Sequence, residues 1–170
     1  SGTGTTIIRG CTIIGSAVQS GGIATLPSGT LNIVIENNII KRNRYGIAIT
    51  NTNTMAIIRN NIIDSNNIQG DPNLGGSGIN FNGNSTLTAL VSKNLIRGNL
   101  WGITIQNTAK PILGNLAVSD SNYIGQNYIY SNSNTGVFYD LYNNTPDSIK
   151  AENNFWGSGI IDSIEAHIFH

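Results

Sequence analysis

The sequence predicts an all-β fold, a β-solenoid of about six coils built from short parallel strands. The first observation is an internal repeat, because the motif at residues 35–43 returns at 58–66, 91–99 and 124–132. The second is the composition of the 170 residues, which are rich in Ile and Asn and include 20 Gly but only 4 Pro. β-Branched residues favour strands, and Asn and Gly tolerate tight bends. Helix is therefore expected to be scarce.

Aligning the repeats on their second asparagine gives a first column of polar residues at intervals of 23 to 33 residues: Cys11, Asn38, Asn61, Asn94, Asn127 and Asn154. An apolar residue stands three positions before each member and another two positions after it. This spacing indicates two short strands that meet at a corner. Asn enters the left-handed region readily, so we expect the column residues to turn these corners. Their side chains can then hydrogen-bond from coil to coil as an asparagine ladder.

A second column follows five residues later, at Asn43, Asn66, Asn99 and Asn132. Each repeat then continues with Gly and an alternating strand, at residues 46–49, 78–81, 102–105 and 136–139. Three strands and three turns per coil are therefore predicted. Neighbouring coils are expected to pair in parallel, about 4.8 Å apart.

The repeated pattern I-x-x-N-x-I-x-x-N…G-I-x-I resembles the right-handed parallel β-helix repeat of the pectate-lyase-like superfamily. That superfamily includes polysaccharide lyases and epimerases, copper-site accessory proteins and phage tailspikes. The resemblance covers nearly the whole chain and implies a right-handed parallel β-helix. It does not select an activity, because this fold carries many functions.

Residues 1–157 are interpreted as the coils and residues 158–170 as a short amphipathic helix that caps the open end of the core. Four isoleucines of this last segment fall at helical spacing, at positions 160, 161, 164 and 168. Asp162 and Glu165 are spaced as a capping box. His167 and His170 are placed on the same helix, facing solvent.

The motif N-N-x-W-G at residues 153–157 resembles the terminal segment of uncharacterised secreted bacterial β-helix proteins. In those proteins a short strand follows the helix, whereas this chain is expected to stop at the helix. The resemblance implies that this chain is the truncated C-terminal part of such a protein, and that the protein is secreted or lies on the cell surface of a bacterium. The open first coil would then contact the rest of the parent chain or another protein.

The charge pattern argues against nucleic acid as a partner, because the net charge is +0 and only 11% of residues are charged. Apolar runs are too short to span a membrane. Charges of alternating sign stand in two columns, Arg9, Glu36, Arg59 and Lys41, Asp64, Arg97. In stacked coils these side chains are neighbours, so the columns predict ion pairs that fix the register.

The candidate ligand-binding residues are Arg44, Tyr45, Asn80, Trp101, Thr104 and Phe138. Tyr45 and Trp101 each precede the glycine of an alternating strand, so their rings either shield the edges of the coils or line one edge of a groove. Aromatic rings bind sugar faces with little loss of side-chain entropy. Asn80, Thr104 and Arg44 would add polar contacts. The outward positions of these strands hold no acid or base, so no catalytic residue, cofactor or metal ion is assigned.

The leading hypothesis is an extracellular, non-catalytic module that binds a polysaccharide or serves as a rigid spacer in a larger secreted or surface protein. A polysaccharide lyase or epimerase is the alternative, with catalytic residues in the loops or in further coils. Asp120 and Asp140, with Lys110 or Arg97, are the residues that such an enzyme could use. A second alternative is the shaft of a phage or an adhesin.

Overall fold

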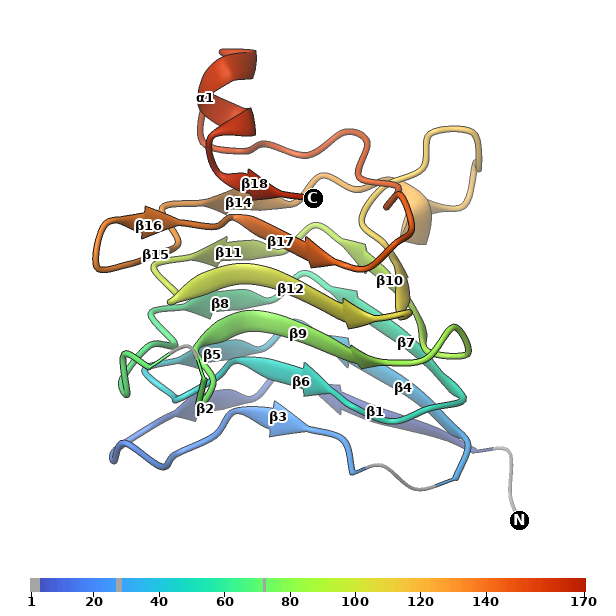
Figure 1. Ribbon diagram of the computed structural model, residues 1–170. Helices are drawn as coiled ribbons and strands as arrows, with labels where there is room; N and C mark the ends of the chain where they lie inside the picture. The colour runs from blue at the N-terminus through green and yellow to red at the C-terminus, as the bar shows by residue number, and fades with distance from the viewer. Residues whose placement is uncertain (1–3, 27–28, 72) are drawn as a thin grey trace.

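The computed structural model describes residues 4–26, 29–71 and 73–170. These residues wind into a stack of coils with the amino terminus at one end and helix α1 (Ile161–Glu165) at the other (Figure 1). Three parallel sheets run along the stack, which confirms the predicted fold class.

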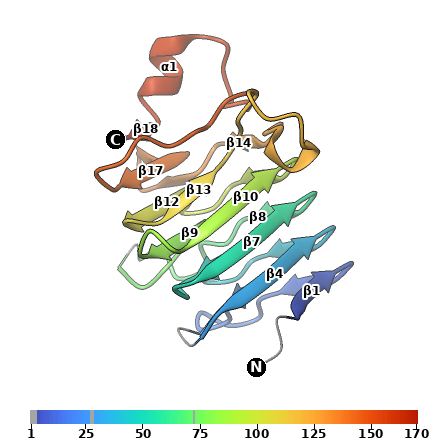
Figure 2. The same cartoon turned by 90° about the vertical axis from the view of Figure 1, so that its right-hand side faces the viewer.

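Sheet A lies on one side and faces the viewer in Figure 2; its strands are β1 (Thr5–Arg9), β4 (Leu31–Glu36), β7 (Thr54–Arg59), β10 (Thr88–Ser92) and β13 (Lys110–Ile112). Sheet B consists of three-residue strands: β2 (Thr12–Ile14), β5 (Ile39–Lys41), β8 (Ile62–Asp64), β11 (Leu95–Arg97) and β14 (Tyr128–Tyr130). Sheet C contains β3 (Ile23–Ala24), β6 (Ile47–Ile49), β9 (Ser77–Gly83), β12 (Trp101–Asn107), β17 (Leu141–Asn144) and β18 (Ile168–Phe169).

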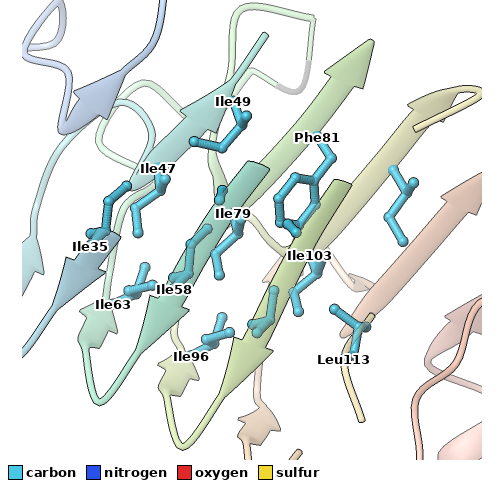
Figure 3. Close-up of a cluster of buried hydrophobic side chains, with 14 of the residues drawn as sticks. Ile35, Ile47, Ile49, Ile58, Ile63, Ile79, Phe81, Ile96, Ile103 and Leu113 are labelled. Carbon is cyan, nitrogen blue, oxygen red and sulfur yellow. The ribbon is translucent and has the colours of Figure 1, made fainter. Parts of the chain in front are cut away.

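The core consists of stacked aliphatic side chains that point inward from all three sheets (Figure 3). Ile35 of β4 pairs with Ile58 of β7, and Ile58 pairs with Val91 of β10, so equivalent residues lie directly above one another. All three are fully buried. Each such side chain contributes roughly 1.5–3 kcal/mol by leaving water. The register predicted from the repeat is therefore the register that fills the core.

The first asparagine column forms a continuous ladder from Asn38 to Asn154. Each Nδ2 donates to the Oδ1 of the next coil at 2.8–3.0 Å. The same oxygen accepts the backbone N–H of the preceding ladder residue at 3.0 Å. The second column, from Asn43 to Asn132, repeats this arrangement with amide contacts of 2.9–3.0 Å. The predicted asparagine ladder is therefore confirmed, and the second column forms a ladder as well.

The corners are turned by a different residue from the one expected. At the first ladder the left-handed residue is the one before each asparagine, as at Asn60 (φ 55°), Lys93 (φ 58°) and Gln126 (φ 58°). These residues are exposed, whereas the ladder asparagines are buried. The left-handed residue bends the chain so that the next side chain points into the corner. The ladder asparagine thus supplies hydrogen bonds, and its neighbour supplies the bend.

The prediction of an alternating strand at residues 136–139 is wrong. Strands β15 (Ser133–Asn134) and β16 (Val137–Phe138) form an antiparallel hairpin, and sheet C continues at Leu141, which pairs with Ile103. Asp140 therefore occupies the place of the glycine that precedes the other strands. Its Oδ1 accepts hydrogen bonds from the backbone nitrogen (3.1 Å) and Nδ2 (2.8 Å) of Asn132, so a carboxylate ends the second ladder.

The last segment differs from the expectation in three respects. Helix α1 spans only Ile161–Glu165, its N-cap residue is Ile160, and no side chain caps it, so the predicted capping box is absent. His167 lies beyond the helix, with its Nδ1 3.0 Å from Oδ2 of Asp140. A short strand, β18, does follow the helix and pairs in parallel with β17.

The first charge column is confirmed, because Glu36 pairs with Arg9 (2.8 Å) and with Arg59 (2.7 Å). In the second column Arg97 pairs with Asp64 at 3.1 Å, but no ion pair joins Lys41 to Asp64, although the structure describes both side chains. Within the described residues, no helix is long and apolar enough to cross a membrane.

The ladder predicts a large cost for Asn94→Ala. Asn94 donates to Ile58 O and to Asn127 Oδ1, and its own Oδ1 accepts from Asn61. Truncation leaves buried groups unpaired, so we expect the free energy of unfolding in urea to fall by about 2–4 kcal/mol. Asn60→Gly is the control, because Gly keeps the left-handed corner and Asn60 is exposed; its cost should stay below about 0.5 kcal/mol. Equal costs would contradict the ladder's role.

Stability should also depend on the Glu36 carboxylate. The hydrogen bond from Arg59 holds the pKa of Glu36 below its ordinary value of 4.5. The carboxylate therefore stabilises the fold at pH above 4.5, and this contribution is lost as the pH falls through the lower folded-state pKa. In urea unfolding, Glu36→Gln should be less stable than wild type at pH 7, and the difference should shrink below pH 4. A difference that is independent of pH would contradict this assignment.

Candidate functional site

A cleft of about 190 Å³ opens on the outer face of sheet C. Its floor is the column Ala48, Asn80 and Thr104, which stand opposite one another on β6, β9 and β12. The neighbouring positions on these strands are buried isoleucines and Phe81 of the core, so strand alternation directs the column outward. The cleft is lined by Tyr45, Ala48, Asn73, Gly75, Ser77, Asn80, Trp101, Thr104 and Gln106.

A short hydrogen-bond chain crosses the floor of the cleft. Thr104 Oγ1 donates to Asn80 Oδ1 at 2.7 Å. Ser77 Oγ lies 3.0 Å from Thr104 Oγ1 and is therefore the donor of that bond. No partner of Asn80 Nδ2 is recorded among the described residues. These hydrogen bonds thus fix the orientation of the Asn80 amide and leave its nitrogen as a donor for a ligand.

Aromatic side chains stand at two sides of the cleft. Trp101 stacks on Tyr142, with ring centroids 4.9 Å apart and planes 15° apart. Tyr142 stacks in turn on Phe169 at 4.5 Å. The indole Nε1 of Trp101 is buried and has no hydrogen-bond partner within the described part of the chain. The stack therefore holds the Trp101 ring in place at the side of the cleft.

Tyr45 is held on its other side by Arg44. The Arg44 Cζ lies 5.7 Å from the centroid of the Tyr45 ring, and its Nη1 donates to Gln19 Oε1 at 2.8 Å. Arg44 Nε is buried and unpaired among the described residues. Arg44 also packs against the loop at Gly75, which lines the cleft. This arginine therefore supports the wall of the cleft from behind.

Four of the six predicted residues line this one cleft: Tyr45, Asn80, Trp101 and Thr104. Arg44 stands behind Tyr45. Phe138 lies elsewhere, because it belongs to the β15–β16 hairpin, and its ring stacks on His167 at 5.0 Å. The sequence predicts Phe138 on the groove strand because residues 136–139 carry the same pattern of Gly and alternating residues as the true strands.

Several residues of the site were missed. Ser77 and Gln106 lie on β9 and β12, and their positions follow from the register of the paired strands. Tyr142 stands opposite Thr104, but the wrong strand assignment hid this relation. Asn73 and Gly75 reach the cleft from a loop between β8 and β9, for which the repeat gave no signal.

The cleft can stack and hydrogen-bond but presents no carboxylate, imidazole or thiol along its described lining. The side chains considered for an enzyme are engaged elsewhere: Asp140 ends the ladder, Asp120 accepts from Asn122 N, Lys110 pairs with Asp147, and Arg97 pairs with Asp64. Within the described residues, no group of three or more His, Cys, Asp or Glu side chains is placed to hold a metal ion.

Comparison with known proteins identifies the architecture but not a ligand. The model of a family described as "Right handed beta helix region" matches residues 1–86, about half of the chain. No curated protein and no solved structure gives a match. The matched segment contains the first coils, where both ladders begin and where strands β1 to β9 establish the three sheets. The chain therefore belongs to the right-handed β-helix family.

Proposed function

We propose that this chain is a non-catalytic β-helix module that binds a polysaccharide through the cleft on sheet C. The observation that carries the proposal is the combination of aromatic walls, Tyr45 and Trp101, with an amide nitrogen, Asn80 Nδ2, that has no partner within the described residues, around one hollow. A sugar ring has apolar C–H faces and a rim of hydroxyl groups. Stacking on rings and hydrogen bonding to amides match these two surfaces.

The size of the cleft suits one unit of a polymer. Its volume of about 190 Å³ lies below the roughly 300–1,000 Å³ of sites that enclose a drug-sized ligand. The cleft crosses three coils, and the strands beneath it are about 4.8 Å apart. A glycan that lies along the stack would therefore place one ring between Tyr45 and Trp101 and extend beyond the cleft at both ends.

We place this module in a larger secreted or surface protein of a bacterium, where it also acts as a rigid spacer. The resemblance of residues 153–157 to the terminal segment of such proteins supports this setting. The strands of the first coil, β1, β2 and β3, each form the edge of a sheet. Edge strands present unpaired backbone groups, so a further part of the parent chain or another protein would bind there.

The glycan-binding proposal predicts a local response to ligand. In ¹⁵N–¹H NMR spectra, adding cellohexaose or chitohexaose should shift the side-chain signals of Asn80 Nδ2 and Trp101 Nε1. Trp101→Ala should weaken binding at the cleft at least tenfold, about 1.4 kcal/mol, because the stacking surface is lost. The affinity of Trp101→Phe should lie between those of the wild type and Trp101→Ala, since Phe keeps a ring but offers a smaller stacking surface.

Phe138→Ala is the matched control, because Phe138 is an exposed aromatic residue outside the cleft. It should leave the Asn80 and Trp101 responses unchanged. If neither hexasaccharide moves these two signals at millimolar concentration, the proposal that the cleft binds a glycan is overturned.

A further inference from the structure

A second hollow, which we call the corner trough, lies on the outer side of the bend between sheets A and B. Its volume is about 590 Å³, and it is lined by residues 93–95, 126–128 and 153–155. Two of its rings are exposed, Tyr128 at 55% and Phe155 at 44%. Their centroids lie 5.6 Å apart with the planes tilted by 51°. Such rings on a solvated surface indicate a surface that binds a partner or ligand.

The trough follows from the way each coil turns. Each of the three coils at the trough contributes a left-handed residue, then a ladder asparagine, then an outward residue that stands on sheet B or pairs with it. The left-handed residues form a polar wall of Lys93, Gln126 and Asn153. The outward residues form an apolar wall of Leu95, Tyr128 and Phe155. The ladder asparagines between the walls are fixed by their own hydrogen bonds.

The apolar wall continues beyond the trough. Ile62 stands opposite Leu95 in sheet B, and Ile39 stands opposite Ile62. Their side chains are exposed at 40% and 37%. The apolar row therefore runs along the stack axis with one residue in each of five coils, at steps of about 4.8 Å.

The polar wall keeps hydrogen-bonding capacity. Asn153 Nδ2 donates to Ile124 O at 2.9 Å, which leaves its Oδ1 as an acceptor. No partner of the Lys93 ammonium or of the Gln126 side chain is recorded among the described residues. Lys93 is the one charged residue in the described lining of the trough.

From these features we infer that the corner trough is a second binding site, for a neutral glycan chain that lies along the stack axis; the ligand class rests on the proposed function. Exposed rings beside amides match the two surfaces of a sugar. The repeated row suits a linear polymer. Side chains on one face of an extended peptide recur about every 6.6 Å, whereas the residues of the apolar row are about 4.8 Å apart. An extended peptide therefore does not match the row. Nucleic acid requires several cationic contacts, and the trough has one lysine.

The test uses the 170-residue chain with cellohexaose and chitohexaose as probes, followed by calorimetry and ¹⁵N–¹H NMR. We expect two hexasaccharides per chain, with shifts at the Gln126 side-chain amide as well as at Trp101 Nε1. Phe155→Ala should weaken the trough site at least tenfold and reduce the stoichiometry to one, while the Trp101 signal still responds. Tyr128→Leu should weaken the trough less, because it keeps apolar area without a ring.

The outcomes separate the two sites. One ligand per chain, with shifts at Trp101 and none at Gln126, would overturn the trough and leave the cleft. Shifts at Gln126 that persist in Trp101→Ala, with no response at Trp101 in the wild type, would support the trough and overturn the cleft assignment. No response to either probe at either position would overturn both.

Discussion

The hydrogen bond between the side-chain amides of buried asparagines in successive coils is the interaction on which this structure depends. Each amide within a ladder accepts two hydrogen bonds and donates to the next coil, so it satisfies corner backbone groups that no strand can pair. Removing one leaves several buried polar groups without partners. Because the ladders fix the register, every outward position becomes a straight column, and both candidate sites are built from such columns.

The solenoid could be predicted from the sequence because the ladder and the core impose the same residue types in every coil. Spacing alone could not distinguish the strand at Leu141 from the similar pattern at residues 136–139. What decides between them is that Asn132 needs an acceptor, and the Asp140 carboxylate supplies it. The left-handed corner residues were misplaced by one position, since both members of an Asn-Asn pair suit that conformation.

The two sites could be predicted only in part, because the repeat reveals positions on the strands but not in loops. Tyr45, Asn80, Trp101 and Thr104 follow from the strand register, which the repeat reveals. Asn73 comes from a loop of irregular length, and Phe169 joins the aromatic stack only because β18 adds a strand to sheet C. The corner trough was missed altogether, because Tyr128 and Phe155 occupy positions that hold isoleucine in lower coils.

Both ladders also give the rod an electrical direction. The amide-to-amide hydrogen bonds of both ladders all run from one coil to the next toward the carboxyl terminus, and hydrogen bonds in such a series polarise one another. The second series ends on an anion, Asp140, while the first begins with the backbone N–H of Cys11 donating to Asn38. A new coil inserted by gene duplication would preserve this direction, whereas two rods joined at like ends would reverse it at the junction. The ladders can therefore be extended coil by coil within one chain. They cannot continue across a junction between two like ends.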